Sequence, residues 1–317
     1  MSEITLEDVK RAAVNVYQYL QPTPLFEYPG LSKLVGTKVW LKHENHQPVG
    51  AFKIRGGLNL LANLSDSEKA AGLYTASTGN HGQSIAYAAR VAGIKATIAV
   101  PENANTGKVA AMKNLGASVV HAGKDFDEAR AWAKKESEKN GGVFVGPTDR
   151  SLIEGVATYT LEIMQQLPDV DCIIVPVGAG SGACGTAIVA KAINPKVEVI
   201  GVQSAQAPAM QQSWKNHHME SSTCTTIAEG MATRVPFQNT QDIMRKYLDD
   251  FVLVSDDEIN QAVLYLLEHS HNMVEEAGAA ALAAAIKYQA RFANKKVVLV
   301  ISGGNLSMEN LAKLLSK

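Results

Sequence analysis

A lysine at position 53 lies in a setting that suits a reactive amine. Lys53 follows the aromatic residue Phe52 and comes shortly before the pair Gly56-Gly57, in the stretch PVGAFKIRGG. A solvated lysine needs no such neighbours, whereas an amine held in a pocket can attack an aldehyde and form a covalent link. The pattern therefore makes Lys53 a candidate nucleophile.

A glycine-rich segment, GAGSGACG at residues 178–185, is a candidate anion site. Glycine lets backbone N–H groups approach a ligand closely, and a following helix adds its positive end. Gly180, Gly182 and Gly185 also match the dinucleotide-binding fingerprint, but the next predicted strand ends in Gln203, where that fingerprint requires an acid. We interpret the segment as a cup for a single phosphate; a plain strand-to-helix turn is the alternative.

Two further glycine turns, STGNHGQ at residues 77–83 and SGGN at residues 302–305, follow predicted strands. The hydroxyl, amide and backbone N–H groups of the first could surround a carboxylate, although His81 alone could equally pack there. The second alone could be an ordinary loop. Together with Lys53 and the phosphate cup, these turns indicate a cofactor that carries both a phosphate and an aldehyde, and pyridoxal phosphate meets both requirements.

Strands and helices must alternate along the chain to position these turns. Apolar, β-branched runs predict strands at residues 38–42, 73–77, 96–100, 118–121, 143–146, 172–177, 197–203, 251–254 and 296–301. Amphipathic runs between them predict helices, among them residues 83–91, 126–139 and 152–167. The alternation is typical of an α/β protein with parallel sheets, and ligands of such sheets bind beyond the carboxyl ends of the strands.

Local sequence signals indicate two helix starts and one irregular segment. Ser65 and Glu68 have capping-box spacing, and Asn80 is a candidate helix cap. The polar stretch at residues 213–226 lacks periodicity and predicts an exposed excursion.

Composition excludes several classes of protein. The 317 residues carry a formal net charge of −1, so no basic excess is present to bind nucleic acid or an acidic membrane surface. The apolar runs are too short to span a bilayer, and the first ten residues lack the apolar core of a secretion signal. Three cysteines without metal-ligand spacing favour a reducing, cytoplasmic location.

The four motifs PVGAFKIRGG, STGNHGQ, GAGSGACG and SGGN, in this order, resemble those of the fold-type II pyridoxal-phosphate enzymes. The chain is most similar to the threonine/serine dehydratase and serine racemase branch, from about Pro22 to the C-terminus. The resemblance implies two open twisted sheets flanked by helices. It also implies a large cofactor-binding domain of residues 1–71 and 150–317 and a small domain of residues 72–149.

The resemblance also implies a role for each motif residue. Lys53 would hold the cofactor covalently and act as the base, with Thr78 as the second candidate catalytic residue. Ser302 would meet the pyridine nitrogen, and a hydroxyl partner there leaves this nitrogen largely unprotonated, which favours elimination. The remaining cofactor contacts would come from Phe52, Asn80, Gly178, Ala179, Gly180, Ser181 and Gly182. The substrate carboxylate would be bound by Ser77, Thr78, Asn80 and His81.

The sequence departs from the family pattern at three places. Ala51 replaces the usual Ser or Thr two residues before the lysine. Thr78 replaces the serine of the racemases, so racemisation stays open but disfavoured. The positions that hold a divalent cation in many relatives read Gln203, Ala207 and Ala209, which predicts no metal there.

The expected activity is a dehydratase (ammonia-lyase) reaction on L-threonine or L-serine, yielding a 2-oxo acid and ammonia. Another β-hydroxy amino acid, such as 3-hydroxyaspartate or phenylserine, and serine racemisation are the alternatives. An NAD-dependent oxidoreductase is disfavoured by Gln203, and a non-catalytic module would leave the motifs unexplained. Arg234, His217 and His218 are open candidates for contacting the substrate side chain. The length indicates a short form without a regulatory domain, and we expect a homodimer.

Overall fold

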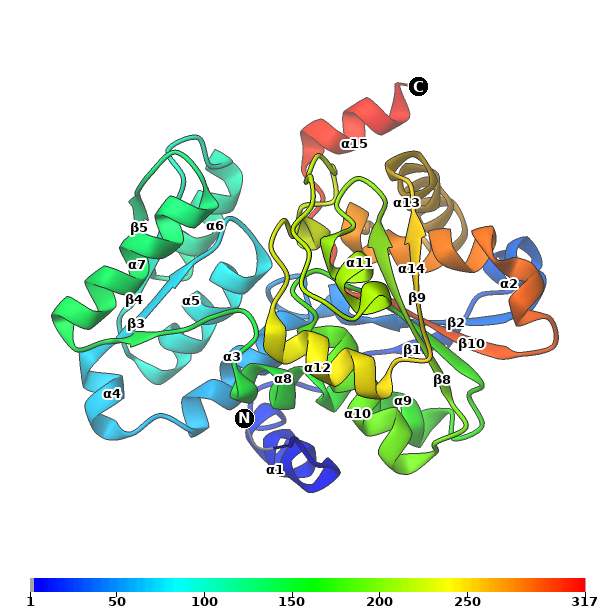
Figure 1. The fold of residues 1–317 in the computed structure, drawn as a ribbon, viewed down its shortest axis with the longest axis horizontal. Helices are drawn as coiled ribbons and strands as arrows, with labels where there is room; N and C mark the ends of the chain where they lie inside the picture. Colours follow the sequence, from blue (N-terminus) through cyan, green and yellow to red (C-terminus); the bar gives the residue numbers. More distant parts are fainter. Residues whose placement is uncertain (1–2, 317) are drawn as a thin grey trace.

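The computed structural model describes residues 3–316, which form two open β-sheets flanked by helices (Figure 1). This arrangement confirms the predicted α/β class with two sheets. The larger, six-stranded sheet has the order β1-β2-β10-β7-β8-β9, with strands Leu25–Glu27 (β1), Lys38–His43 (β2), Cys172–Pro176 (β7), Glu198–Ser204 (β8), Asp250–Val254 (β9) and Lys296–Ile301 (β10). Its neighbouring strands are parallel, except that β1 runs antiparallel to β2.

The smaller, four-stranded sheet is parallel throughout and has the order β5-β4-β3-β6. Its strands are Leu73–Ala76 (β3), Ala96–Val100 (β4), Ser118–His121 (β5) and Val143–Phe144 (β6). In Figure 1 this sheet, coloured cyan to green, lies beside the larger one.

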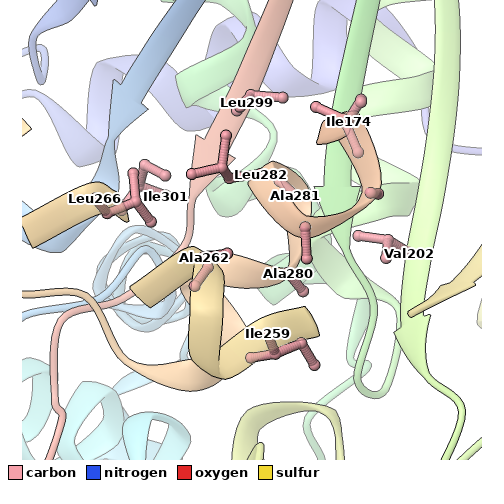
Figure 2. Packing of buried hydrophobic residues seen from close by; sticks show 14 of the residues in the cluster. Ile174, Val202, Ile259, Ala262, Leu266, Ala280, Ala281, Leu282, Leu299 and Ile301 are labelled. Carbon is pink, nitrogen blue, oxygen red and sulfur yellow. The ribbon is translucent and has the colours of Figure 1, made fainter. Parts of the chain in front are cut away.

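Helices cover both faces of the larger sheet because the side chains of a buried strand alternate between its faces. In β7, Cys172 and Ile174 pack into one apolar cluster, whereas Ile173 and Val175 pack into another. The first cluster, drawn in part in Figure 2, is covered by α2 (Pro29–Val35), α13 (Asp256–Ser270), α14 (Glu276–Lys287), η3 (Gln289–Phe292) and α15 (Met308–Leu315). The second is covered by α1 (Leu6–Val16), α8 (Arg150–Val156), α9 (Thr158–Gln166), α10 (Ser181–Ile193), α11 (Ala209–Asn216) and α12 (Gln238–Tyr247).

The smaller sheet is covered in the same way. Helices α3 (Lys53–Ala62), α5 (Asn80–Ala92) and α6 (Thr106–Asn114) share one of its apolar clusters, and α7 (Phe126–Asn140) packs on the other. Short segments α4 (Asp66–Ala71), η1 (Glu44–His46) and η2 (Glu229–Met231) complete the order of elements. Ile54 and Leu58 of α3 pack into the apolar cluster that α3 shares with α5 and α6. The predicted boundary at residue 72 assigns α3 to the large domain and therefore divides this cluster between the two domains. The two-domain division stays a prediction.

Most of the predicted elements are present, and several of their ends differ by one to three residues from the predicted bounds. The capping box of Ser65 and Glu68 is confirmed. The helix expected at 152–167 is divided at Ala157 into α8 and α9, and strand β1 was not predicted. The expected excursion at 213–226 begins inside α11. Asn80 is the first residue of α5 rather than its cap, because other side chains engage its carboxamide.

Candidate active site

Lys53 lies at the start of α3, where backbone bonds tie its turn to the SGGN loop. The N–H of Phe52 donates to the carbonyl of Ser302 at 3.0 Å, and the N–H of Gly304 donates to the carbonyl of Gly50 at 2.8 Å. The SGGN loop directly follows β10, so Lys53 lies beyond the carboxyl end of a central strand of the larger sheet. This is the position in which parallel sheets bind their ligands.

The amine of Lys53 is a cation without a carboxylate partner among residues 3–316. Its Nζ donates to Ser181 Oγ at 3.2 Å and lies 5.1 Å from the centroid of the Phe52 ring. Removal from water lowers the pKa of Lys53 to about 8. A desolvated amine of this pKa is partly neutral near pH 7 and can act as a nucleophile or base.

The start of α10, beside Lys53, is built to hold an anion. Gly180 has a φ of +100°, a left-handed conformation that glycine adopts without strain, and the helix begins at Ser181 without a side-chain cap. At Gly178, an added Cβ would lie 2.1 Å from the carbonyl oxygen of Gly230, so only glycine fits there. The uncapped N–H groups and the positive end of a 13-residue helix therefore face the amine.

Phe52 packs between the start of α10 and α9. Its ring makes an edge-to-face contact with Tyr159, with 6.2 Å between centroids, and would lie 3.3 Å from a Cβ at Gly182. The hydroxyl of Tyr159 donates to the carbonyl of Gly182 at 3.1 Å. Phe52 thus holds the lysine turn against the glycine cup. These features fit a cofactor that carries a phosphate and reacts with an amine.

The STGNHGQ segment links β3 to α5. Ser77 Oγ accepts a hydrogen bond from the N–H of Gly79 at 3.2 Å, and Thr78 is half-buried. His81 is turned toward the fold: its Nε2 lies 3.0 Å from Thr75 Oγ1, whose hydroxyl donates to the carbonyl of Val145. Burial lowers the pKa of His81 to about 3, so this ring is neutral at physiological pH.

Asn80 joins the STGNHGQ and SGGN segments through two residues that the sequence did not single out. Its Nδ2 donates to Glu275 Oε1 at 2.7 Å, and its Oδ1 accepts from Asn305 Nδ2 at 2.7 Å. Asn305 ends the SGGN motif, but no role was predicted for its side chain. Glu275 lies 195 residues from Asn80 in the chain; its only sequence signal is an acid directly before the apolar run of α14.

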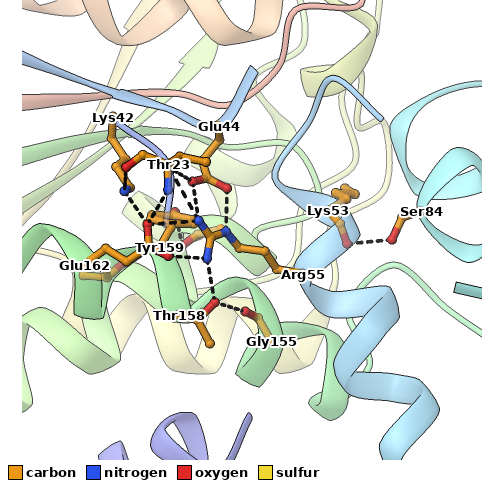
Figure 3. A network of polar contacts seen from close by, with 12 residues as sticks. Thr23, Lys42, Glu44, Lys53, Arg55, Ser84, Gly155, Thr158, Tyr159 and Glu162 are labelled. Carbon is orange, nitrogen blue, oxygen red and sulfur yellow. Dashed lines mark hydrogen bonds and ion pairs between the residues drawn. The ribbon is translucent and has the colours of Figure 1, made fainter. Parts of the chain in front are cut away.

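A buried ionic cluster anchors the first turn of α3 (Figure 3). Arg55 donates to Glu44 Oε2 at 2.7 Å and to Glu162 Oε1 at 2.6 Å, and Lys42 pairs with Glu162. Thr158 accepts a further bond from Arg55 at 3.1 Å. Two cations and two anions balance each other, which buried charges require. On the other side of the turn, Ser84 Oγ of α5 donates to the carbonyl of Lys53 at 2.6 Å.

Other candidates are engaged elsewhere. Arg234 is exposed and pairs with Asp127 on α7, and His217 and His218 are exposed residues after α11. Gln203 is buried, and its Oε1 accepts from the N–H of Gln211 at 3.1 Å. No group of three or more His, Cys, Asp or Glu side chains between residues 3 and 316 could hold a metal ion. Over the same residues, no helix is long and apolar enough to cross a membrane.

Comparisons with known proteins agree with this geometry. Residues 16–303 match the family described as "Pyridoxal-phosphate dependent enzyme". The chain is 41% identical to L-threonine ammonia-lyase of Thermotoga maritima, over 99% of the chain and 79% of that relative. It resembles the processed form of threonine deaminase isoform 2 from Solanum lycopersicum (TM-score 0.93, 33% identity, 99% of this chain and 94% of that one). Maize serine racemase is similarly close (TM-score 0.94, 30% identity, 99% and 98%).

Proposed function

Because the chain belongs to the pyridoxal-phosphate dependent enzyme family, we propose that it is a dehydratase acting on a β-hydroxy amino acid. L-Threonine and L-serine are the expected substrates, and a 2-oxo acid and ammonia are the products. The single observation that carries the proposal is Lys53, a desolvated amine without an acidic partner among the described residues, placed at the uncapped start of α10. The relatives named threonine ammonia-lyase and threonine deaminase support this choice of substrate.

The cofactor is pyridoxal phosphate, and the residues around Lys53 suit each of its parts. Residues 178–182 and the helix behind them would hold the phosphate, Phe52 would pack near the ring, and Ser302 and Asn80 would bind its polar atoms. Lys53 would hold it covalently. When bound, this cofactor withdraws electrons from the Cα of an amino acid and so makes the Cα proton acidic.

The residues of the chain supply the remaining steps of elimination. The N-terminus of α5, with Ser77 and Thr78, binds and orients the substrate carboxylate through N–H and hydroxyl donors. Lys53 Nζ, freed as an amine when the substrate amine replaces it, takes the Cα proton, which its lowered pKa permits near neutrality. The Cα proton and the β-hydroxide that leave together make up one molecule of water, and hydrolysis of the unsaturated product releases ammonia.

Serine racemisation is the second candidate function, and the structural likeness to maize serine racemase favours it. Racemisation requires a second proton donor on the face of Cα opposite Lys53, and Thr78 is the candidate for that role. Dehydration of 3-hydroxyaspartate or phenylserine is a further alternative within the same chemistry. We propose that none of these reactions requires a divalent cation, because Gln203, Ala207 and Ala209 offer no carboxylate.

We also propose that the chain forms a homodimer in the cytoplasm. Phe26 and Met273 are exposed apolar residues, 54% and 45% accessible, and Phe26 packs against His43. A second copy that packs on this surface would cover both apolar side chains. Three free cysteines support a reducing compartment.

One experiment tests cofactor attachment and another tests the reaction. Borohydride reduction of the holoenzyme followed by peptide mapping should label Lys53, and a label on another lysine would overturn the site. An assay for 2-oxo acids with both configurations of threonine, serine, 3-hydroxyaspartate and phenylserine should give the highest rate with L-threonine or L-serine. It should be repeated with a chelator, since loss of activity that magnesium or calcium restores would contradict the metal-free proposal.

A further inference from the structure

Glu275 is a buried acid at the centre of the site that no step of the proposed reaction uses. It occupies the N-cap position of α14 without a side-chain capping bond, is 9% exposed, and its N–H donates to the carbonyl of Gly303 at 3.1 Å. A Cβ at Gly303 would lie 2.4 Å from Glu275 Oε1, so the glycine of the SGGN motif leaves the space that the carboxylate fills. Its other oxygen, Oε2, accepts from the N–H of Asn305 at 3.2 Å.

Glu275 and Asn305 together fix the orientation of the Asn80 carboxamide. Asn305 Nδ2 donates to the carbonyl of Val49 at 2.9 Å and to Asn80 Oδ1 at 2.7 Å, which uses both of its hydrogens. The oxygen of Asn80 must therefore face Asn305, and its Nδ2 must face Glu275, to which it donates one hydrogen at 2.7 Å. The second hydrogen on Nδ2 remains for a ligand.

We propose that Glu275 is a positioning residue that directs the second amide N–H of Asn80 at the phenolic oxygen of bound pyridoxal phosphate and, by its own charge, sets the protonation of that oxygen. The inference rests on the proposed contact between Asn80 and the cofactor. A carboxylate held against the far side of the same carboxamide disfavours a second negative charge on the phenolic oxygen. A neutral carboxyl there removes that repulsion.

The charge of Glu275 changes in the neutral range. Burial raises its pKa to about 7, against the opposing effects of the Asn80 hydrogen bond and of Lys108 on α6, while the neighbouring Glu276 raises it further. Glu276 is a matched control. It is also buried, but it accepts its bond from Asn310 Nδ2 at 2.8 Å, away from Asn80.

The test is the absorption spectrum of the bound cofactor, recorded for the holoenzyme between about pH 5 and pH 9. Its bands report the protonation state of the phenolic oxygen. In the wild type we expect their ratio to change with a midpoint near pH 7, the pKa of Glu275. Glu275→Gln should abolish this transition, because the amide keeps the hydrogen bond but carries no charge. Glu276→Gln should retain it.

Two further variants keep the inference testable if Glu275→Gln does not fold. Asn305→Ala frees the Asn80 carboxamide and should weaken cofactor binding about 3- to 10-fold, measured by dialysis, while the transition persists. Asn80→Ala should change the spectrum itself. A transition that survives in Glu275→Gln, one that is lost in Glu276→Gln, or a wild-type spectrum in Asn80→Ala would each overturn the inference. Spectra do not depend on which amino acid reacts, so a failed 2-oxo acid assay would refute the proposed function alone.

Discussion

At the scale of single residues, two lysines removed from water show how function and stability diverge. Lys42 is fully buried but pairs with Glu162, whereas Lys53 has a hydroxyl partner only, in the region that the structure describes. A buried cation without an anion costs stability unless it loses its proton, and the pKa of Lys53 is lowered accordingly, to about 8. The setting that makes this amine reactive therefore lowers the stability of the fold.

We predict that Lys53→Met stabilises the cofactor-free protein at pH 7. The pKa of Lys53 is about 8 when folded, against about 10.4 in an unfolded chain, so between these values only the unfolded state holds the proton. The free energy of unfolding must then rise with pH across this window, and the charged amine costs stability below it. Allowing for its partial contact with water, we expect a gain of about 1–2 kcal/mol.

Urea denaturation of the cofactor-free variants at several pH values measures this effect. The gain should shrink as pH approaches 10, where wild-type Lys53 is neutral. Lys42→Met is the matched control, and it should lose stability at pH 7 because it leaves Glu162 with one cation fewer. A Lys53→Met protein that is less stable than the wild type at pH 7 would contradict the prediction.

We predict that elimination outruns racemisation, because Thr78 is the candidate proton donor on the far face of Cα. The extra methyl of threonine restricts its rotamers, so its hydroxyl is a poorer proton donor to the far face of Cα than that of a serine. His81 does not replace it, since its Nε2 faces Thr75 and its low pKa keeps the ring neutral. With L-serine we expect pyruvate to form well ahead of D-serine, measured by chiral chromatography. Thr78→Ser should raise the D-serine fraction; faster D-serine than pyruvate in the wild type would favour the racemase.

At the scale of elements, the sequence predicted those features that have a strong local cause. Strands β4, β5 and β10 have their predicted bounds because continuous β-branched runs between turn signals have few other uses. Strand β1, Leu25–Glu27, is too short to show a period. The break between α8 and α9 falls at Ala157, two residues after Gly155, and a single glycine inside a helical pattern does not by itself predict a break. Tertiary packing decides such boundaries.

The candidate site could be predicted from the sequence only where its backbone conformation requires glycine. Lys53 and the cup at 178–182 have such a signature, and the structure brings them together. Glu275 has none, because its role arises from a contact with Asn80 that forms only when loops from both sheets meet. An isolated acid beside an apolar run cannot be told in sequence from a helix cap.

We predict that the ionic cluster at the start of α3 contributes strongly to the stability of the fold. Glu162 is 3% exposed and pairs with both Arg55 and Lys42. Glu162→Ala would therefore leave one buried positive charge without a balancing anion. We expect a loss of about 3–5 kcal/mol in the free energy of unfolding. Glu309→Ala, which removes an exposed pair with Lys313, should cost less than about 0.5 kcal/mol. Equal urea midpoints for the two variants would show that the cluster does not anchor α3.

At the scale of the whole molecule, a small number of polar contacts near the candidate site join the elements around the smaller sheet to those around the larger sheet. Besides the Asn80 bonds, Lys108 of α6 pairs with Glu229 of η2, and Arg234 pairs with Asp127 of α7. The first pair is next to the cup, since Gly230 packs against Gly178, whereas both partners of the second are at least half exposed. These positions suggest different roles for two similar ion pairs.

We predict that the Lys108–Glu229 pair favours the closed, substrate-binding arrangement of the two sheets. If substrate binds only when they are closed, then weakening the pair lowers the competent fraction and raises KM by the same factor. A partly exposed pair contributes up to about 1 kcal/mol, so Glu229→Gln should raise KM for the amino acid up to about 5-fold with little change in kcat. Salt screens the same attraction and should raise the wild-type KM between about 0.01 and 0.5 M NaCl. The salt dependence should be weaker in Glu229→Gln and unchanged in Glu309→Gln, which breaks an exposed pair within α15 that does not link the two sheets. Steady-state assays on the three proteins measure both effects, and an equal loss in Glu309→Gln would assign the effect to overall charge rather than to closure.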